Sequence, residues 1–192
     1  VMHLRACVKD DEVVILKEDA EPIPAGFAQA AVGTWHDRIK ATGWAELRVS
    51  AADNHLSNAQ RAKACGFLEG YCGAERIDQH YRSFVEHNFR NKGQNVPTEF
   101  LAANHAWMQR MLVDPPREDA STWSSVAWLL QQVEGLCAGY NLAATEGGLP
   151  EMTLVDFLTL QAVGDLEDLA APAPVGEQSH CSGLVAVEKG GG

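Results

Sequence analysis

The sequence predicts an α+β fold in which short strands come first and helices follow. Three observations carry this prediction. Apolar and polar residues alternate near the N-terminus, apolar residues recur three and four apart from position 57 onward, and helix-capping sequences precede two of these later runs. The chain has 192 residues, 46% of them apolar, which is enough to bury the core of one ordinary domain. We therefore expect one globular unit.

The strands are predicted from their alternation. Apolar residues alternate over residues 4–9, two consecutive aspartates make a turn signal, and an apolar run follows at residues 13–16, which together predict a hairpin. Residues 45–49 alternate again and predict a third, half-buried strand. Between these strands we expect a helix over residues 27–39.

The first long helix is predicted by a capping box. Ser57 is followed three residues later by Gln60, and the helix that they open carries Gly66 and Gly70 on one face. Glycine disfavours helix formation, so a pair spaced by four residues indicates close approach of another backbone.

Four further segments complete the helical part. Residues 77–89 predict a separate helix, and Pro97 opens another, which two prolines end at positions 115 and 116. The apolar stripe of the helix that Pro97 opens is expected to face the core: Phe100, Trp107, Met108, Met111 and Leu112. The most regular amphipathic helix follows: Trp123, Val126, Leu130, Val133 and Cys137.

The last predicted helix has Thr153 as its N-cap and Asp156 at its third position. Met152 and Phe157 are placed to form a hydrophobic staple, and Gly164 is expected to end the helix.

The composition of the chain argues against several classes of function. The formal net charge of −11 repels phosphate backbones, so we expect no nucleic-acid partner. No apolar run approaches the roughly 20 residues that span a bilayer. Five cysteines without CxxC spacing indicate neither a complete disulfide framework nor a zinc ribbon, so four of them are expected as core thiols or as one disulfide: Cys7, Cys65, Cys72 and Cys137.

One cluster of polar residues has a metal site as an alternative interpretation. Asp78, His80, Glu86 and His87 have ligand chemistry, but their spacing matches neither of the zinc-protease helix motifs. We expect no stable metal and no cofactor.

The C-terminal part has a different character. Residues 171–180 read APAPVGEQSH, which predicts an exposed, protease-accessible linker. Cys181 follows, between His180 and Ser182, and a short strand-like run covers residues 184–187.

Three segments, in this order, resemble the phospholipase B-like family, the lysosomal laminal-ancestor-type proteins. They are GFLEGYCGAERIDQHY (66–81), MTLVDFLTLQAVGDLEDL (152–169) and HCSGLV (180–185). The phrases FLEGY and HCS resemble most the phospholipase B domain-containing 1 type.

The resemblance implies an N-terminal nucleophile hydrolase with an αββα sandwich, of which this chain is the helix-rich N-terminal portion plus the start of the nucleophile strand. It implies a small N-terminal fragment at residues 1–169, a processing linker at 170–180 and the start of the catalytic fragment at 181–192. Autocatalytic cleavage between His180 and Cys181 then makes Cys181 the nucleophile. Eleven residues follow Cys181 (192 minus 181), so we expect this fragment to be truncated here.

The implied chemistry suits a cysteine at a new N-terminus. A free thiol has a pKa near ~8.5, so it needs a base at neutral pH. Cleavage frees the α-amine of Cys181, whose typical pKa of ~7.7 to 8.0 fits proton transfer.

The resemblance also implies the substrate class, acyl esters of phospholipids. Two alternatives stay open: an amidase acting on N-acyl lipids or peptides, and an inactive scaffold of the same fold. The implied partners are the larger C-terminal fragment of the same precursor, which is expected to supply the oxyanion hole, and lipid. The implied location is lysosomal or secreted.

Overall fold

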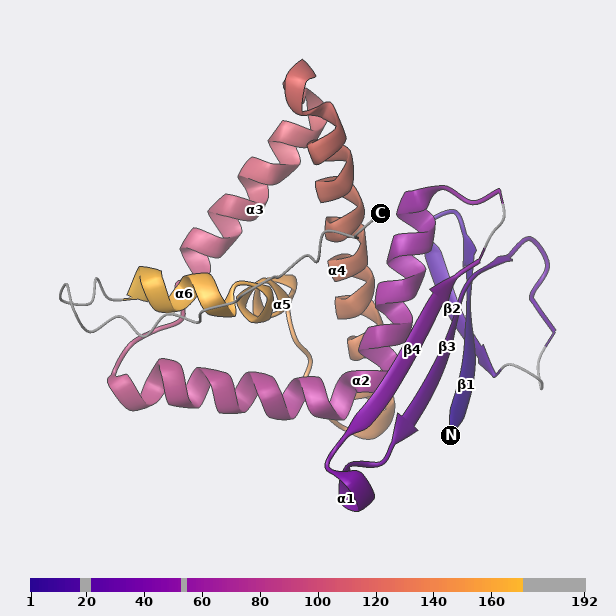
Figure 1. Cartoon of the computed structure of the whole chain (residues 1–192), viewed down its shortest axis with the longest axis horizontal. Coiled ribbons are helices and arrows are strands. Elements are labelled where there is room, and N and C mark those ends of the chain that lie inside the picture. Colours follow the sequence, from indigo (N-terminus) through magenta and orange to yellow (C-terminus); the bar gives the residue numbers. More distant parts are fainter. Residues whose placement is uncertain (18–21, 53–54, 171–192) are drawn as a thin grey trace, which may run out of the picture.

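The computed structural model describes residues 1–17, 22–52 and 55–170 (Figure 1). His180 and Cys181, the linker and the predicted strand at 184–187 lie outside these described residues. The described part is a mixed α+β structure, as the sequence predicts, with a sheet at one side and helices at the other (Figure 1).

The sheet has four antiparallel strands in the order β2-β1-β3-β4. Their bounds are β1 Met2–Lys9, β2 Glu12–Lys17, β3 Ala28–Asp37 and β4 Ala45–Ala51. Lys9 pairs with Glu12 across a turn of two aspartates, and Asp10 there has a φ of 53°. The predicted hairpin and the predicted strand at 45–49 are thus confirmed.

The helix predicted over residues 27–39 is wrong, because this segment forms β3. Alanines at the start of the segment favour a helix, but Val32, Thr34 and Trp35 suit a strand, and the segment pairs with β1 on one side and β4 on the other. Ala30 and Ala31 are fully buried in the cluster that also contains Leu68. Tertiary packing therefore overrides local propensity here.

Helix α2 (Asn58–Asn88) is continuous, so the prediction of a separate helix at 77–89 is wrong. Its capping box is confirmed, with Gln60 N donating to Ser57 Oγ at 3.2 Å. The first half of α2 packs on the sheet through Ala64 and Leu68, and its second half joins an apolar cluster through Phe84 and Val85. One helix thus connects the sheet to the other helices.

Glycines bring α2 and α4 (Ala120–Gly147) into backbone contact. A Cβ atom added at Gly66 or Gly70 would lie 1.9 or 2.0 Å from a carbonyl oxygen of α4, and one added at Gly135 or Gly139 would lie 2.0 Å from a carbonyl oxygen of α2. Each glycine thus presents a Cα–H group to a backbone carbonyl of the other helix. The close approach predicted from the first pair is confirmed, and α4 supplies a matching pair.

The remaining helices are short or peripheral: α1 Ile39–Thr42, η1 Arg90–Lys92, α3 Thr98–Val113, η2 Arg117–Asp119, α5 Leu154–Gln161 and α6 Val163–Ala170. Gly164 does not end the last helix, contrary to the prediction. Helix α5 ends at Gln161, and Gly164 lies in the first turn of α6 with open space around it. None of the helices among the described residues has the length and apolarity to cross a bilayer.

The apolar stripe predicted for α3 does not form a core. Leu101 is the buried residue of this helix, whereas Phe100 and Trp107 are about half exposed, at 50% and 46%. Trp107 packs edge-on against Trp123, with ring centroids 5.4 Å apart. The stripe fails because α3 touches α4 near one end of each helix instead of along its length (Figure 1).

The α2–α4 contact predicts the effect of one added methyl group. Gly139→Ala places a Cβ against the Phe67 carbonyl, which belongs to the backbone and cannot rotate away, so we expect a loss of at least about 3 kcal/mol of unfolding free energy. The matched control is Gly147→Ala in the same helix, where the space is open and Ala is expected to stabilise by up to about 1 kcal/mol. Urea unfolding of both variants measures this, and equal midpoints would contradict the role given to the contact.

Candidate functional site

The described residues nearest in sequence to the predicted nucleophile are those of α5 and α6. Helix α6 ends at Ala170, the first residue of the predicted linker. The structure therefore describes the segment that leads to this linker, residues 150–170, which we call the platform.

Helix α5, in the platform, begins with a capping box. Asp156 N donates to Thr153 Oγ1 at 3.3 Å, and Thr153 N donates to Asp156 Oδ2 at 2.7 Å. Met152 and Phe157 are both buried in the cluster of Tyr140, as expected of a staple. The predicted start of this helix is confirmed.

Helix α4 holds the chain that enters α5. Asn141 Nδ2 donates to the Met152 carbonyl at 2.9 Å, and Met152 N donates to Asn141 Oδ1 at 3.0 Å. Tyr140 Oη donates to the Pro150 carbonyl at 2.9 Å. Burial, then the nearby Asp78 carboxylate, raises the pKa of Tyr140 to about 12, so it is a neutral donor at physiological pH. Three side-chain hydrogen bonds from Tyr140 and Asn141 thus fix residues 150–152, and we call this set the clamp.

Helix α2 holds the same platform from a second side. Tyr81 Oη donates to Asp156 Oδ1 of the capping box. Burial, then the hydrogen bond to this carboxylate, raises the pKa of Tyr81. Tyr81 closes the segment GFLEGYCGAERIDQHY, and Asp156 lies in MTLVDFLTL. Two of the three segments that carry the family resemblance therefore meet in one hydrogen bond.

Sequence reasoning identified Asp156 as a cap but missed Tyr140, Asn141 and Tyr81. Asn141 left a signal, because it is a residue of low helix propensity in the interior of a long helix. The partners of these side chains lie 10, 11 and 75 positions away, so helical periodicity does not indicate them.

The polar cluster weighed as a metal site does not converge. Asp78 is 2% exposed and accepts from Arg82 one turn later, whereas His80, Glu86 and His87 are exposed. Among residues 1–17, 22–52 and 55–170, no group of three histidines, cysteines or acids could hold a metal ion. Arg82 thus pairs with the buried Asp78 carboxylate within the fold.

The four described cysteines are free, so the disulfide alternative among them is wrong. Burial raises the pKa of each thiol, and it raises that of Cys72 to about 11. A raised pKa leaves less thiolate, which is the nucleophilic form. None of Cys7, Cys65, Cys72 and Cys137 has the environment of an activated nucleophile.

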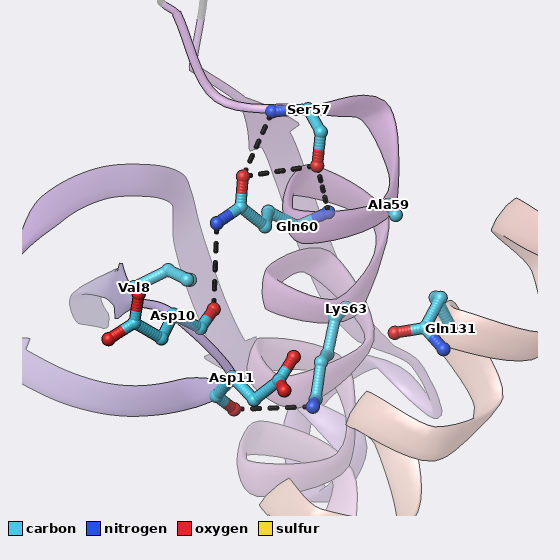
Figure 2. A pocket seen from close by; sticks show the side chains of 8 residues that line it. All are labelled: Val8, Asp10, Asp11, Ser57, Ala59, Gln60, Lys63 and Gln131. Atoms are coloured by element: carbon cyan, nitrogen blue, oxygen red, sulfur yellow. Dashed lines mark hydrogen bonds between the residues drawn. The ribbon is translucent and has the colours of Figure 1, made fainter.

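A surface hollow of about 330 Å³ lies where the β1–β2 turn meets the start of α2 (Figure 2). Its polar groups are paired with one another: Gln60 Nε2 donates to the Asp10 carbonyl at 3.5 Å, and Lys63 Nζ donates to the Asp11 carbonyl at 3.2 Å. Gln131 of α4 lines the other side. The hollow lies between the hairpin and α2, and the Ser57 hydroxyl and Lys63 amine in its lining are both engaged in hydrogen bonds.

Comparison with known proteins identifies relatives of the chain. The family model of phospholipase B matches residues 31–190. Phospholipase B-like 1 of Bos taurus is 30% identical over 178 residues, which cover 83% of this chain and 32% of that protein. Phospholipase B-like 1 of Homo sapiens is 28% identical over 174 residues (83% and 31%), and phospholipase B of Crotalus adamanteus is 28% identical over 143 residues (72% and 25%). The chain spans about a third of the length of the first of these curated relatives.

The clamp on residues 150–152 predicts the effect of Asn141→Ala. This change removes both hydrogen bonds to Met152 and leaves buried backbone groups unpaired, so we expect a loss of about 1–3 kcal/mol of unfolding free energy. Amide exchange should also quicken in residues 150–157. Thr145→Ala, which removes a hydroxyl bonded to its own helix, is the control. If the two variants lose equal stability, Asn141 does not anchor the platform.

Burial of the thiols predicts slow alkylation. In the folded chain at pH 8, iodoacetamide should modify Cys7, Cys65, Cys72 and Cys137 more slowly than in denaturant. Cys72 should have more than about 100-fold less thiolate than a thiol of ordinary pKa. Mass spectrometry of timed digests measures each rate. Modification of any of the four at its denatured rate would contradict the burial argument.

Proposed function

Because the chain belongs to the phospholipase B family, we propose that it is the N-terminal part of a self-processing cysteine hydrolase that cleaves acyl ester bonds of phospholipids. The observation that carries this proposal is the extent of the family match, which continues to residue 190 and so includes His180 and Cys181. The raised thiol pKa values of the four described cysteines support the choice of the fifth.

Maturation begins at the peptide bond between His180 and Cys181. The Cys181 thiol, losing its proton, attacks the His180 carbonyl carbon, and the C–N bond breaks as the nitrogen takes up a proton. This step leaves a thioester and a free amine. Water then hydrolyses the thioester, which gives a His180 carboxylate and restores the thiol. Nucleophile and base now belong to one residue, which fixes their separation without a separate histidine.

Turnover uses the same two groups. The α-amine accepts the thiol proton as sulfur attacks the ester carbonyl of a phospholipid, and the resulting ammonium protonates the departing alcohol. Water activated by the amine then hydrolyses the acyl thioester, releasing a fatty acid. Before cleavage the Cys181 nitrogen is an amide and cannot act as a base, so the uncut chain is inactive in this scheme.

Three expectations that accompany this mechanism are part of the proposal. The larger C-terminal fragment completes the αββα sandwich and supplies the oxyanion hole and acyl pocket. Residues 170–180 are the processing linker, which follows α5 and α6, and Asn141, Tyr140 and Tyr81 hold the entry to α5. The protein is lysosomal or secreted.

Replacement of Cys181 tests the proposal. In the precursor that contains this chain and its complementary part, Cys181→Ala should abolish both self-cleavage, measured by intact mass, and fatty acid release from phosphatidylcholine vesicles. Cys72→Ala is the matched control and should leave both unchanged. The same preparations tested on an N-acyl amide separate esterase from amidase activity. A Cys181→Ala precursor that still cuts itself and releases fatty acid would exclude the mechanism.

A further inference from the structure

Trp44 is the most exposed of the tryptophans in the chain. It is 79% exposed, whereas Trp128, for example, is 41% exposed. Tryptophan is highly buried on average in folded proteins, so an indole displayed in this way is unusual. Trp44 lies between α1 and β4, in the connection that leaves β3, and Figure 1 shows α1 beyond one end of the sheet. We call residues 37–45 the tip.

Hydrogen bonds hold the tip in a defined conformation. Asp37 Oδ1 accepts from Ile39 N at 3.1 Å, and Asp37 Oδ2 accepts from the Arg76 guanidinium of α2 at 2.9 Å. Trp44 N donates to Thr42 Oγ1 at 3.3 Å. The Ile39 amide, then Arg76, lowers the pKa of Asp37, so these bonds persist at mildly acidic pH. A side chain on a structured turn loses little conformational freedom when it binds a surface.

The tip and its flanks are positively charged in an acidic chain. Residues 36–48 contain three cations and two carboxylates, a formal charge of +1 (3 minus 2), whereas the whole chain carries −11. Both carboxylates are paired, one with Arg76 at 2.9 Å and one with Arg48 at 2.5 Å. Arg38 and Lys40 are exposed and have no ion-pair partner within the described part of the chain. Exposed charges farther than about 8 Å are largely screened, so these two cations dominate what the tip attracts.

An exposed indole close to two cations matches the chemistry of a phospholipid surface. Tryptophan rings concentrate at the headgroup level of membranes, and each lysine or arginine near anionic lipid adds to binding. A stable protein interface, by contrast, buries about 800 Å² of each partner around an apolar core from which lysine is depleted. One aromatic side chain on a short connection therefore favours lipid over a protein partner.

We propose that the tip is a docking site for anionic phospholipid surfaces, with Trp44 among the headgroups and with Arg38 and Lys40 on lipid phosphates. This inference deepens the proposed function by naming the surface through which the protein meets its aggregated substrate. It rests on the proposed function for the benefit to turnover, whereas the docking itself does not require Cys181.

Vesicle binding tests the proposal in the precursor that contains this chain and its complementary part. The precursor should co-sediment with vesicles of phosphatidylcholine and phosphatidylserine more than with phosphatidylcholine alone, and added salt should weaken this binding. Trp44→Ala should lower the partition coefficient at least about ten-fold, because the indole no longer enters the headgroup region. Arg38→Gln combined with Lys40→Gln should lower it at least about ten-fold on the anionic vesicles only.

Trp128→Ala is the matched control. Trp128 is also exposed, but residues 120–133 of α4 contain no charged side chain, and Figure 1 shows the start of α4 at the opposite end of the molecule from α1. We expect Trp128→Ala to bind vesicles as the parent does. Urea midpoints equal to that of the parent show that the variants fold.

Failure of the parent precursor to bind anionic vesicles would overturn the proposal, as would equal binding by the parent and Trp44→Ala. Loss of binding in Trp128→Ala but not in Trp44→Ala would assign the docking to α4 and also overturn it. If Trp44→Ala instead separates the two parts of the cleaved protein or changes its oligomeric mass, the tip is a protein interface and the proposal is wrong.

Cys181→Ala separates this inference from the proposed function, because it should abolish self-cleavage and leave vesicle binding unchanged. Trp44→Ala should still cleave between His180 and Cys181. Vesicle binding that depends on Trp44, in a protein that neither cuts itself nor releases fatty acid, would support the docking site and remove the mechanism. Self-cleavage and fatty acid release with equal vesicle binding by the parent and Trp44→Ala would do the opposite.

Discussion

The structure depends on the contact of two helix backbones at four glycines. Gly66 and Gly70 of α2 face carbonyls of α4, and Gly135 and Gly139 of α4 face carbonyls of α2. Through α2 this contact connects the sheet to α4, and through α4 it connects the sheet to the clamp on residues 150–152. Because the clamp fixes residues 150–152, the position at which α5 begins depends on how closely these two helices pack.

Residues of two motifs that lie far apart in the sequence meet at the start of α5. Tyr81 and Asp156 are 75 positions apart in the sequence. Their hydrogen bond instead joins α2 to the capping box of α5. We interpret these motif residues as structural groups that hold α2 against α5, and in the proposed mechanism the covalent chemistry belongs to Cys181.

The sequence predicts correctly the turn and the helix caps, because these depend on contacts between residues that are close together in the sequence. The hairpin around the two aspartates and the caps at Ser57 and Thr153 are as expected. Residues 28–37 were mispredicted because their alanines favour a helix, and only pairing with β1 and β4 makes them a strand. The Gly66 and Gly70 pair indicated a close contact, but its partner helix and the Asn141 clamp depend on packing that periodicity does not encode. The proposed nucleophile, Cys181, rests on family resemblance, and it lies outside the described residues.

The central claim is that position 181 becomes an N-terminus with a thiol and an amine on one residue. N-terminal sequencing of the mature, lipid-hydrolysing protein tests it most directly. The account predicts a chain that begins Cys-Ser-Gly-Leu-Val. A mature protein that hydrolyses phospholipid with the peptide bond between His180 and Cys181 intact would contradict it.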